Sequence, residues 1–190
     1  TEAPVPSNQT PAANSAAALP AARITFSDLP VPSEPEATAQ LVAHGKSVYE
    51  QNCLVCHGVN GDGKGEAAVF LLPKPRNFVQ ANYRLRSTAI GHLPTDDDLF
   101  RSVSIGMAGT PMPPWRIHLS AADRWAVVEY IKTFSPRFAS TNEDRSGVSL
   151  GTPPPRNEAT LAEGKALFTK LACITCHGES GHGDGTSAAA

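Results

Sequence analysis

The sequence predicts an all-α protein whose helices are joined by long loops rich in Gly and Pro, preceded by an extended arm. Apolar residues recur at helical spacing in two segments, one ending at Cys53 and one following Ser120. No segment shows the strict alternation of apolar and polar residues that marks a half-buried strand. Gly and Pro contribute 15 and 17 of the 190 residues, so much of the chain between the helices is expected to be loop.

Composition and charge exclude several classes of protein. Only 41% of the residues are apolar and 6% aromatic, so a group other than side chains is expected to fill part of the core. The formal net charge of -2 gives no reason to expect a nucleic-acid partner. The longest apolar run, residues 67–72, is far shorter than the roughly 18 residues that span a bilayer. We therefore expect no transmembrane helix.

The N-terminal 35 residues are expected to form an extended arm. Residues 1–40 contain seven Pro and ten Ala but no Gly and no Cys, a composition typical of a tether or a wrapping segment. From Pro35 onward the pattern changes, because Leu41, Gly45, Val48 and Tyr49 lie on one face of a predicted helix that ends at Cys53.

The second long helix is expected to begin at Ser120. The sequence Ser-Ala-Ala-Asp from Ser120 to Asp123 resembles a capping box, and Pro136 stops the helix. Its apolar side consists of Val127, Val128, Ile131 and Phe134. Between the two helices we expect mostly loop with short helices.

Residues 139–158 are polar and end near three consecutive Pro, which is typical of a linker between domains. The residues beyond this linker repeat an earlier part of the chain. Gly45-Lys46 matches Gly164-Lys165 with one residue inserted before the next Cys, and residues 57–65 match 177–185 without gaps at an offset of 120. We therefore predict one complete domain at 36–138 and the beginning of a second at 159–190.

All four cysteines lie in two copies of the motif Cys-x-x-Cys-His, namely Cys53, Cys56 and His57, and Cys173, Cys176 and His177. This motif is typical of covalent haem c, in which each thiol forms a thioether to the macrocycle and the adjacent His binds the iron. The alternative is a disulfide in each pair or one four-Cys zinc site. Zinc ribbons place their pairs about 15 to 20 residues apart. Here the offset is 120 residues, so we expect two haems c.

With these motifs, residues 36–138 resemble a complete class I cytochrome c domain and residues 159–190 the start of another. The resemblance implies an all-α class I fold in which Gly45 lets two helices approach closely and Tyr49 meets an aromatic residue of the last helix, Trp125 or Tyr130. It also implies an axial Met on the first iron. Met112 is the candidate, since it lies between prolines in the segment 109–115.

Other residues are alternatives or supporting groups at the first haem. Met107 is interpreted as an apolar filler, and the remaining candidates His44, His92 and His118 as solvated side chains. The family's proximal His donates to the carbonyl of a Pro, here Pro73 or Pro75. A basic cluster before the Met loop is expected to meet a haem propionate through an Arg or, alternatively, to form a docking face. Its members are Lys74, Arg76, Tyr83, Arg84 and Arg86, of which Arg84 and Arg86 are the propionate candidates.

The sixth ligand of the second haem is left open, because no Met follows Cys173. Either the native chain extends past Ala190, or the ligand comes from elsewhere, or the iron is five-coordinate. We expect the first of these, with a second Met loop and a closing helix still to come.

The resemblance implies a dihaem protein that passes single electrons between redox-partner proteins, as a soluble carrier or as a subunit of a membrane-associated respiratory complex. Haem attachment implies a periplasmic or extracytoplasmic location and an export signal removed before Thr1. The competing hypothesis is a peroxidase-like dihaem enzyme with an open site at the second haem. A thiosulfate-oxidising enzyme is disfavoured, because such enzymes use a distal Cys and none is present outside the motifs.

Overall fold

The computed structural model describes residues 29–140 and 142–188 of the chain. Within these residues the regular elements are helices, and the only β-bridge joins Thr88 to Gly147. The predicted all-α fold is therefore confirmed. The chain divides between Gly147 and Val148 into two compact units, which we call the first and the second unit. None of the described helices is long and apolar enough to cross a membrane.

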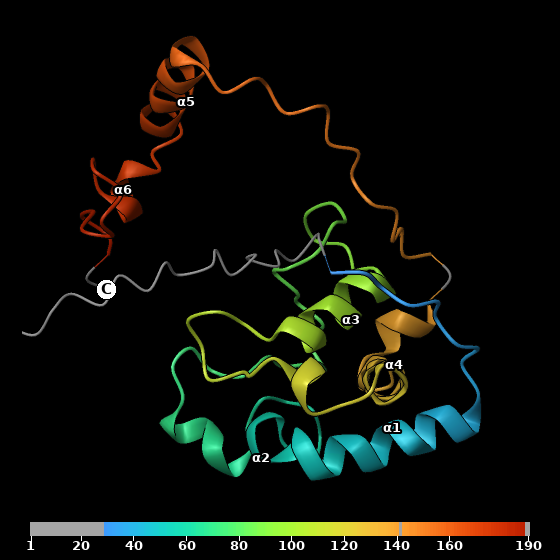
Figure 1. The fold of residues 1–190 in the computed structure, drawn as a ribbon. Coiled ribbons are helices and arrows are strands. Elements are labelled where there is room, and N and C mark those ends of the chain that lie inside the picture. The colour runs from blue at the N-terminus through green and yellow to red at the C-terminus, as the bar shows by residue number, and fades with distance from the viewer. Residues whose placement is uncertain (1–28, 141, 189–190) are drawn as a thin grey trace, which may run out of the picture. The chain divides into compact units, whose positions relative to one another are not determined.

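Among its described residues, the first unit contains four α-helices and three short 3-10 turns. Figure 1 labels the α-helices. The α-helices are α1 (Ala39–Asn52), α2 (Leu54–His57), α3 (Asp96–Ile105) and α4 (Ala121–Lys132). The 3-10 turns are η1 (Glu66–Phe70), η2 (Trp115–Ile117) and η3 (Pro136–Ala139). The second unit contains α5 (Glu158–Lys170) and α6 (Ile174–His177).

Helices α1 and α4 cross at a steep angle, and the crossing is built on a glycine. Figure 1 shows α4 nearly end-on above α1. A Cβ atom at Gly45 would lie only 1.9 Å from the carbonyl oxygen of Ala126, so no other residue allows this approach. Beside it, the rings of Tyr49 and Tyr130 meet edge to face with centroids 5.3 Å apart. Trp125, the other predicted partner of Tyr49, stacks instead on Phe100 of α3 at 4.5 Å.

Helix α4 begins as predicted and is the centre of the core. The Ser120 hydroxyl accepts a hydrogen bond from the Asp123 amide, and the Asp123 carboxylate accepts one from the Ser120 amide, which completes a capping box. The helix is buried on more than the one predicted face: Trp125, Ala126, Val127, Val128, Glu129 and Ile131. Helices α1 and α3 account for much of this burial, and the residues that precede α1 add to it.

The described end of the predicted arm packs against the first unit. Leu29 is buried, and the indole of Trp125 donates a hydrogen bond to the carbonyl of Pro32 at 3.3 Å. Residues 29–38 therefore wrap over α4, whereas residues 1–28 of the predicted arm lie outside the described residues.

Helix α3 lies in the segment expected to be mostly loop with short helices, but its position at residues 96–105 was not predicted. Thr95 and Asp98 form a capping box, and three acidic residues occupy the first turn, where the helix dipole favours negative charge. Phe100 and Leu99 enter the core from this helix. The Thr-x-x-Asp sequence was the signal that could have revealed it.

The first part of the predicted linker belongs to the first unit. Arg145 donates from Nε to the carbonyl of Pro94 at 2.9 Å, and His92 Nδ1 lies 2.9 Å from the carbonyl oxygen of Asp144. These contacts hold residues 142–147 against the loop that precedes α3. Residues 148–156 have no regular structure and lead to α5.

The second unit repeats the start of the first with one local difference. Helix α1 runs to Asn52, directly before Cys53, whereas α5 stops at Lys170 and Ala172 adopts a left-handed conformation with φ of 57°. This turn accommodates the inserted residue before Cys173. Gly164 matches Gly45, but a Cβ there would meet nothing within 4 Å. The described residues of the second unit thus contain no counterpart of the α1–α4 crossing.

Candidate haem site

The two Cys-x-x-Cys-His motifs fold into the same backbone structure. In each, the His amide donates to the carbonyl of the first Cys at 2.9 Å, which closes one helical turn. The His carbonyl then accepts from a glycine amide six residues on, Gly63 or Gly183, again at 2.9 Å. None of the four cysteines forms a disulfide. Each motif therefore places two thiols and an imidazole on a single helical turn, and a tight turn follows directly after it.

A further close approach is shared by the two motifs. A Cβ at Gly65 would lie 2.3 Å from the Val55 carbonyl oxygen, and a Cβ at Gly185 would lie 2.3 Å from that of Thr175. In both units the chain after the motif thus packs directly against the motif helix. The two copies are therefore similar in three-dimensional structure as well as in sequence.

The imidazole of His57 is held by the backbone. Its Nδ1 lies 3.1 Å from the carbonyl oxygen of Arg76. Because a carbonyl can only accept, Nδ1 carries the proton and donates, which leaves Nε2 as the nitrogen able to bind a metal. The expectation that Pro73 or Pro75 supplies this carbonyl was wrong; the acceptor is the residue directly after Pro75. Burial lowers the pKa of His57 and so favours the neutral, metal-binding form.

The loop after α3 holds both methionines of the chain. Met107 donates its amide to the carbonyl of Met112 at 3.1 Å, and the hydroxyl of Thr110 bridges the two by donating to Met107 and accepting from the Met112 amide. Gly106 begins the loop with φ of 66°, and a Cβ there would lie 2.5 Å from the Met112 carbonyl oxygen. The backbone at Met112 is therefore fixed on two sides. The side chains of Met107 and Met112 are both half-buried.

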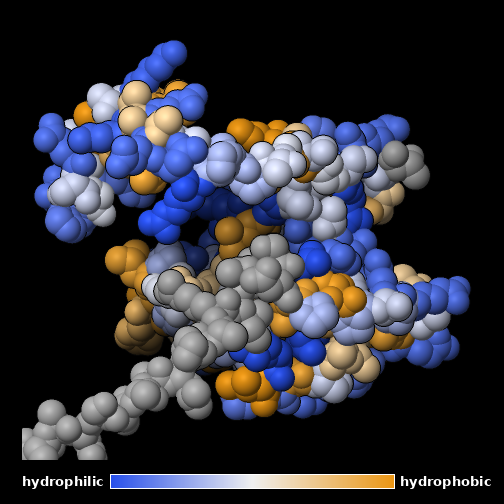
Figure 2. Space-filling model, turned by 45° about the horizontal axis from the view of Figure 1, so that its top comes forward, coloured by the Kyte–Doolittle hydropathy of each residue, from blue (hydrophilic) through white to orange (hydrophobic). Residues whose placement is uncertain are grey.

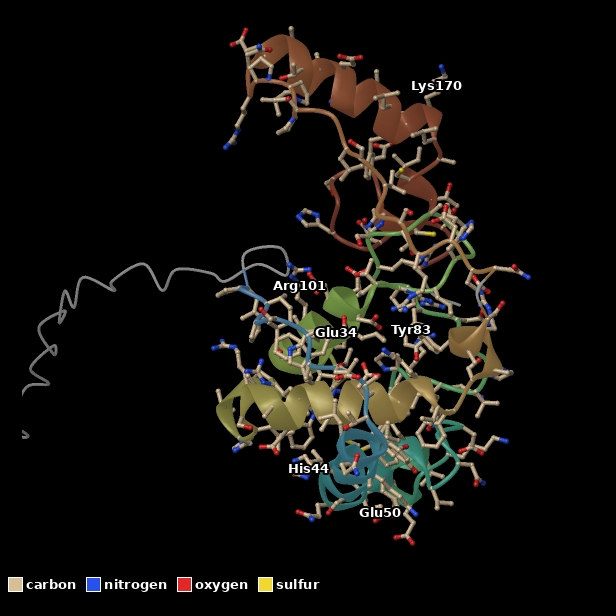
Figure 3. All side chains as sticks on the ribbon, turned by 90° about the vertical axis from the view of Figure 1, so that its right-hand side faces the viewer. Glu34, His44, Glu50, Tyr83, Arg101 and Lys170 are labelled. Carbon is tan, nitrogen blue, oxygen red and sulfur yellow. The ribbon has the colours of Figure 1, made fainter. Side chains whose placement is uncertain are left out.

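A basic cavity of about 370 Å³ lies in the first unit, and none of the described residues that line it is a carboxylate. Its walls are Arg76, Gln80, Ala81, Asn82, Tyr83, Arg84, Arg86, Gly91 and His92. Burial and the neighbouring charge of Arg84 lower the pKa of Arg76. Tyr83 lies within the body of the unit (Figure 3), its hydroxyl is buried without a hydrogen-bond partner in the described part of the chain, and burial raises its pKa. Such a cavity suits an anion.

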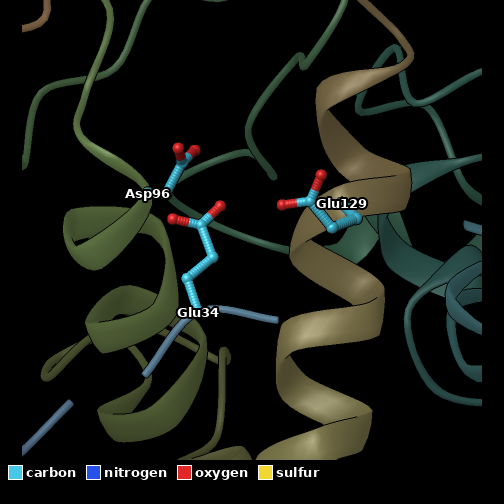
Figure 4. A group of neighbouring side chains, drawn as sticks. All are labelled: Glu34, Asp96 and Glu129. Atoms are coloured by element: carbon cyan, nitrogen blue, oxygen red, sulfur yellow. The ribbon is translucent and has the colours of Figure 1, made fainter. Parts of the chain in front are cut away.

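Three carboxylates converge at another place in the first unit, between the segment before α1 and helices α3 and α4 (Figure 4). They belong to Glu34, Asp96 and Glu129. The ammonium group of Lys132 lies 3.7, 3.1 and 2.6 Å from their respective oxygens, and Arg145 pairs with Asp96 as well. Two cations, Lys132 and Arg145, already pair with this cluster, which makes it an ion-pair network and not a metal site.

Comparison with known proteins agrees with the motif and its surroundings. The family model described as Cytochrome c matches residues 42–135. Among solved structures, the chain is similar to one from the Kuenenia stuttgartiensis reducing HAO-like protein complex Kustc0457/Kustc0458, with 39% sequence identity and a TM-score of 0.72. The match covers 84% of this chain and 69% of that chain. No curated protein sequence matches.

The chain belongs to the class I cytochrome c family. Membership implies covalently bound haem c, and the residues of the first unit fit it. The cytochrome provides a free thiol pair at Cys53 and Cys56, an imidazole whose Nε2 is available at His57, and a cavity whose buried hydroxyl and guanidinium groups lack an anionic partner among the described residues. The two carboxylates of a haem would supply that partner.

The two predicted propionate ligands of the cytochrome have different surroundings in the structure. Arg84 lines the cavity and is exposed, with no other described role. Arg86 also lines it, but its Nε and Nη1 groups donate to the carbonyls of Ala89 and Tyr83, so this side chain mainly holds the loop together. Arg76 and Tyr83 are members of the predicted basic cluster and are both partly buried. A bound anion would therefore stabilise them more than it would Arg84 or Arg86.

The three His residues considered as alternative iron ligands have other surroundings in the structure. The imidazole of His44, on the surface of α1 (Figure 3), lies 2.7 Å from the Asp123 carboxylate. His92 is turned toward Asp144, and His118 is exposed beside Trp115.

A zinc site within a single unit is not supported by the surroundings of the thiols. Among the described residues of its own unit, neither Cys pair gathers the further ligating side chains that would make up a metal site. Burial also raises the pKa of the Cys53 thiol to about 12.

Proposed function

We propose that this cytochrome carries two haems c and transfers single electrons between partner proteins outside the cytoplasmic membrane. The observation that carries the proposal is the set of backbone hydrogen bonds that the two motifs share, since in both motifs these bonds hold two thiols and one imidazole. Haem c, when bound, supplies a one-electron redox centre. The protein's part is to anchor it through Cys53 and Cys56 and to ligate it through His57, with Met112 proposed as the second ligand. His177 is proposed as the iron ligand at the second motif.

Two observations favour a role within a protein complex. The structural neighbour described above belongs to a reducing HAO-like protein complex, so we propose an HAO-like protein as the redox partner. The surface also exposes large apolar side chains (Figure 2 shows such patches amid polar surface). Val69, Phe70 and Leu72 are 71%, 86% and 85% exposed in and after η1, and Val55 of α2 is 50% exposed. Exposed apolar side chains next to the motif helix support protein docking.

A peroxidase-like enzyme is the second candidate. It is favoured by one observation: both methionines of the chain lie in the first unit, so the second haem has no Met ligand from these residues. An iron with an open position can bind peroxide, whereas one ligated by His and Met cannot.

The two candidates differ in their response to peroxide. We expect the oxidised protein to show a low-spin spectrum that hydrogen peroxide leaves unchanged, and the dithionite-reduced protein to show the difference spectrum of haem c. A high-spin component that is converted by stoichiometric peroxide, with catalytic oxidation of an added donor, would contradict electron transfer as the sole function. The same spectra of a Cys173→Ala/Cys176→Ala variant assign any such component to the second haem.

A further inference from the structure

The proximal His57 is contacted on a second side by an aromatic ring. Phe78 stacks on the imidazole with ring centroids 4.5 Å apart and planes inclined by 17°. Phe78 is only 7% exposed, so the stack lies inside the first unit. The Arg76–Phe78 segment therefore holds the imidazole twice, by the carbonyl of Arg76 at Nδ1 and by the ring of Phe78 against its face.

The ring of Phe78 is itself fixed in place. Its amide donates to the carbonyl of Gly61 at 2.7 Å, which ties it to the turn directly after the motif. On the side of the core, Phe134 stacks on it at 6.1 Å with planes inclined by 18°, and Tyr49 meets it at 6.5 Å. A Cβ at Gly61 would lie 2.6 Å from the Phe134 ring, so that ring is also tightly enclosed.

These contacts restrict the one movement of the His57 imidazole that its hydrogen bond leaves free. A single hydrogen bond at Nδ1 fixes the tautomer of the imidazole but allows its plane to tilt about the bond. A tilt would bring the edge of the imidazole into the face of Phe78, which cannot retreat because its backbone is tied to Gly61 and Phe134 backs its ring. The stack thus restricts the plane of the imidazole.

We propose that Phe78 is a positioning residue of the first haem site, which fixes the plane of the His57 ring and thereby sets the magnetic axes and the reduction potential of the iron. The inference rests on the proposed ligation of this iron by His57. The plane of an axial imidazole decides which iron d orbitals overlap with the ring, and burial of the ligand disfavours the more positively charged ferric state.

The test compares two variants of the whole chain that make the same chemical change. In Phe78→Leu the stack on His57 is lost. In Phe100→Leu, the control, the lost ring is also buried and also stacks at 4.5 Å, but on Trp125. The readouts are the hyperfine-shifted haem methyl resonances of the oxidised protein and the reduction potential.

We expect Phe78→Leu to redistribute the methyl shifts and to lower the potential, because water gains access to the ligand, while Phe100→Leu keeps the wild-type pattern and potential despite lower stability. An unchanged pattern in Phe78→Leu, or the same change in both variants, overturns the inference. Neither result affects the proposed function, which fails instead if the wild-type first motif holds no haem ligated by His57.

If Phe78→Leu does not fold, two further measurements test the inference. In the reduced wild-type protein, nuclear Overhauser effects between the ring protons of Phe78 and His57 are expected, and their absence overturns the inference. Phe78→Tyr keeps the stacked ring and should retain the wild-type methyl pattern. A pattern redistributed in this variant would equally refute the role of the ring.

Discussion

Gly45→Ala is expected to destabilise the first unit by about 3 kcal/mol, because overpacking that displaces backbone lies at the upper end of the usual cost. The added Cβ would lie 1.9 Å from the Ala126 carbonyl oxygen and 3.0 Å from the Tyr130 Cβ. The intrinsic preference of Ala for helices acts in the opposite direction and is worth about 1 kcal/mol. A lower free energy of unfolding would show that overpacking outweighs the helix preference of Ala, and a higher one would show the reverse. Urea denaturation of the haem-loaded protein measures it.

Gly147→Ala is the matched control for this prediction. The nearest atom to a Cβ at Gly147 is the Ser87 hydroxyl at 3.7 Å, an ordinary van der Waals distance. We expect a change within about 0.5 kcal/mol at this position, as for most surface substitutions. Equal stabilities of the two variants would show that α1 and α4 do not cross at Gly45.

Met112→Ala is expected to have the largest effect on the haem itself. If Met112 ligates the first iron, its removal abolishes the weak Met-to-iron charge-transfer band in the near infrared of the oxidised protein. It also lowers the reduction potential of that haem, because methionine ligation raises it. Optical redox titration of the intact protein, with the second haem as an internal reference, measures the shift in potential, and the near-infrared spectrum of the oxidised protein shows the band.

Met107→Ala is the control, since its backbone pairs with that of Met112 across the same loop. This variant should keep the near-infrared band. Loss of the band in Met107→Ala and its retention in Met112→Ala would assign the ligand to Met107 instead.

Local sequence patterns predicted the parts of the fold that depend on neighbouring residues. The Ser120 cap, the end of the first helix at Cys53 and the haem motifs all depend on residues within one or two helical turns of each other. Gly45 was also interpreted correctly, because the resemblance to class I cytochromes supplied the second helix. The all-α fold and the family are both confirmed.

The parts that were missed depend on contacts between distant residues. The acceptor for His57 is Arg76, nineteen residues along the chain, and neither spacing nor composition distinguishes it from Pro73 or Pro75. The stack of Phe78 on His57 and the enclosure of Tyr83 depend on the path of the same irregular loop. The position of helix α3 was missed for a different reason, because its Thr95 capping box lies among glycines and prolines that suggested loop.

The number of haems per chain tests the central claim most directly. Pyridine haemochrome analysis of the full-length protein, after extraction of non-covalent haem with acid acetone, counts the covalently attached haem c. We expect two per chain, falling to one in the Cys173→Ala/Cys176→Ala variant. A value of one in the wild-type protein, unchanged in that variant, would contradict the central claim.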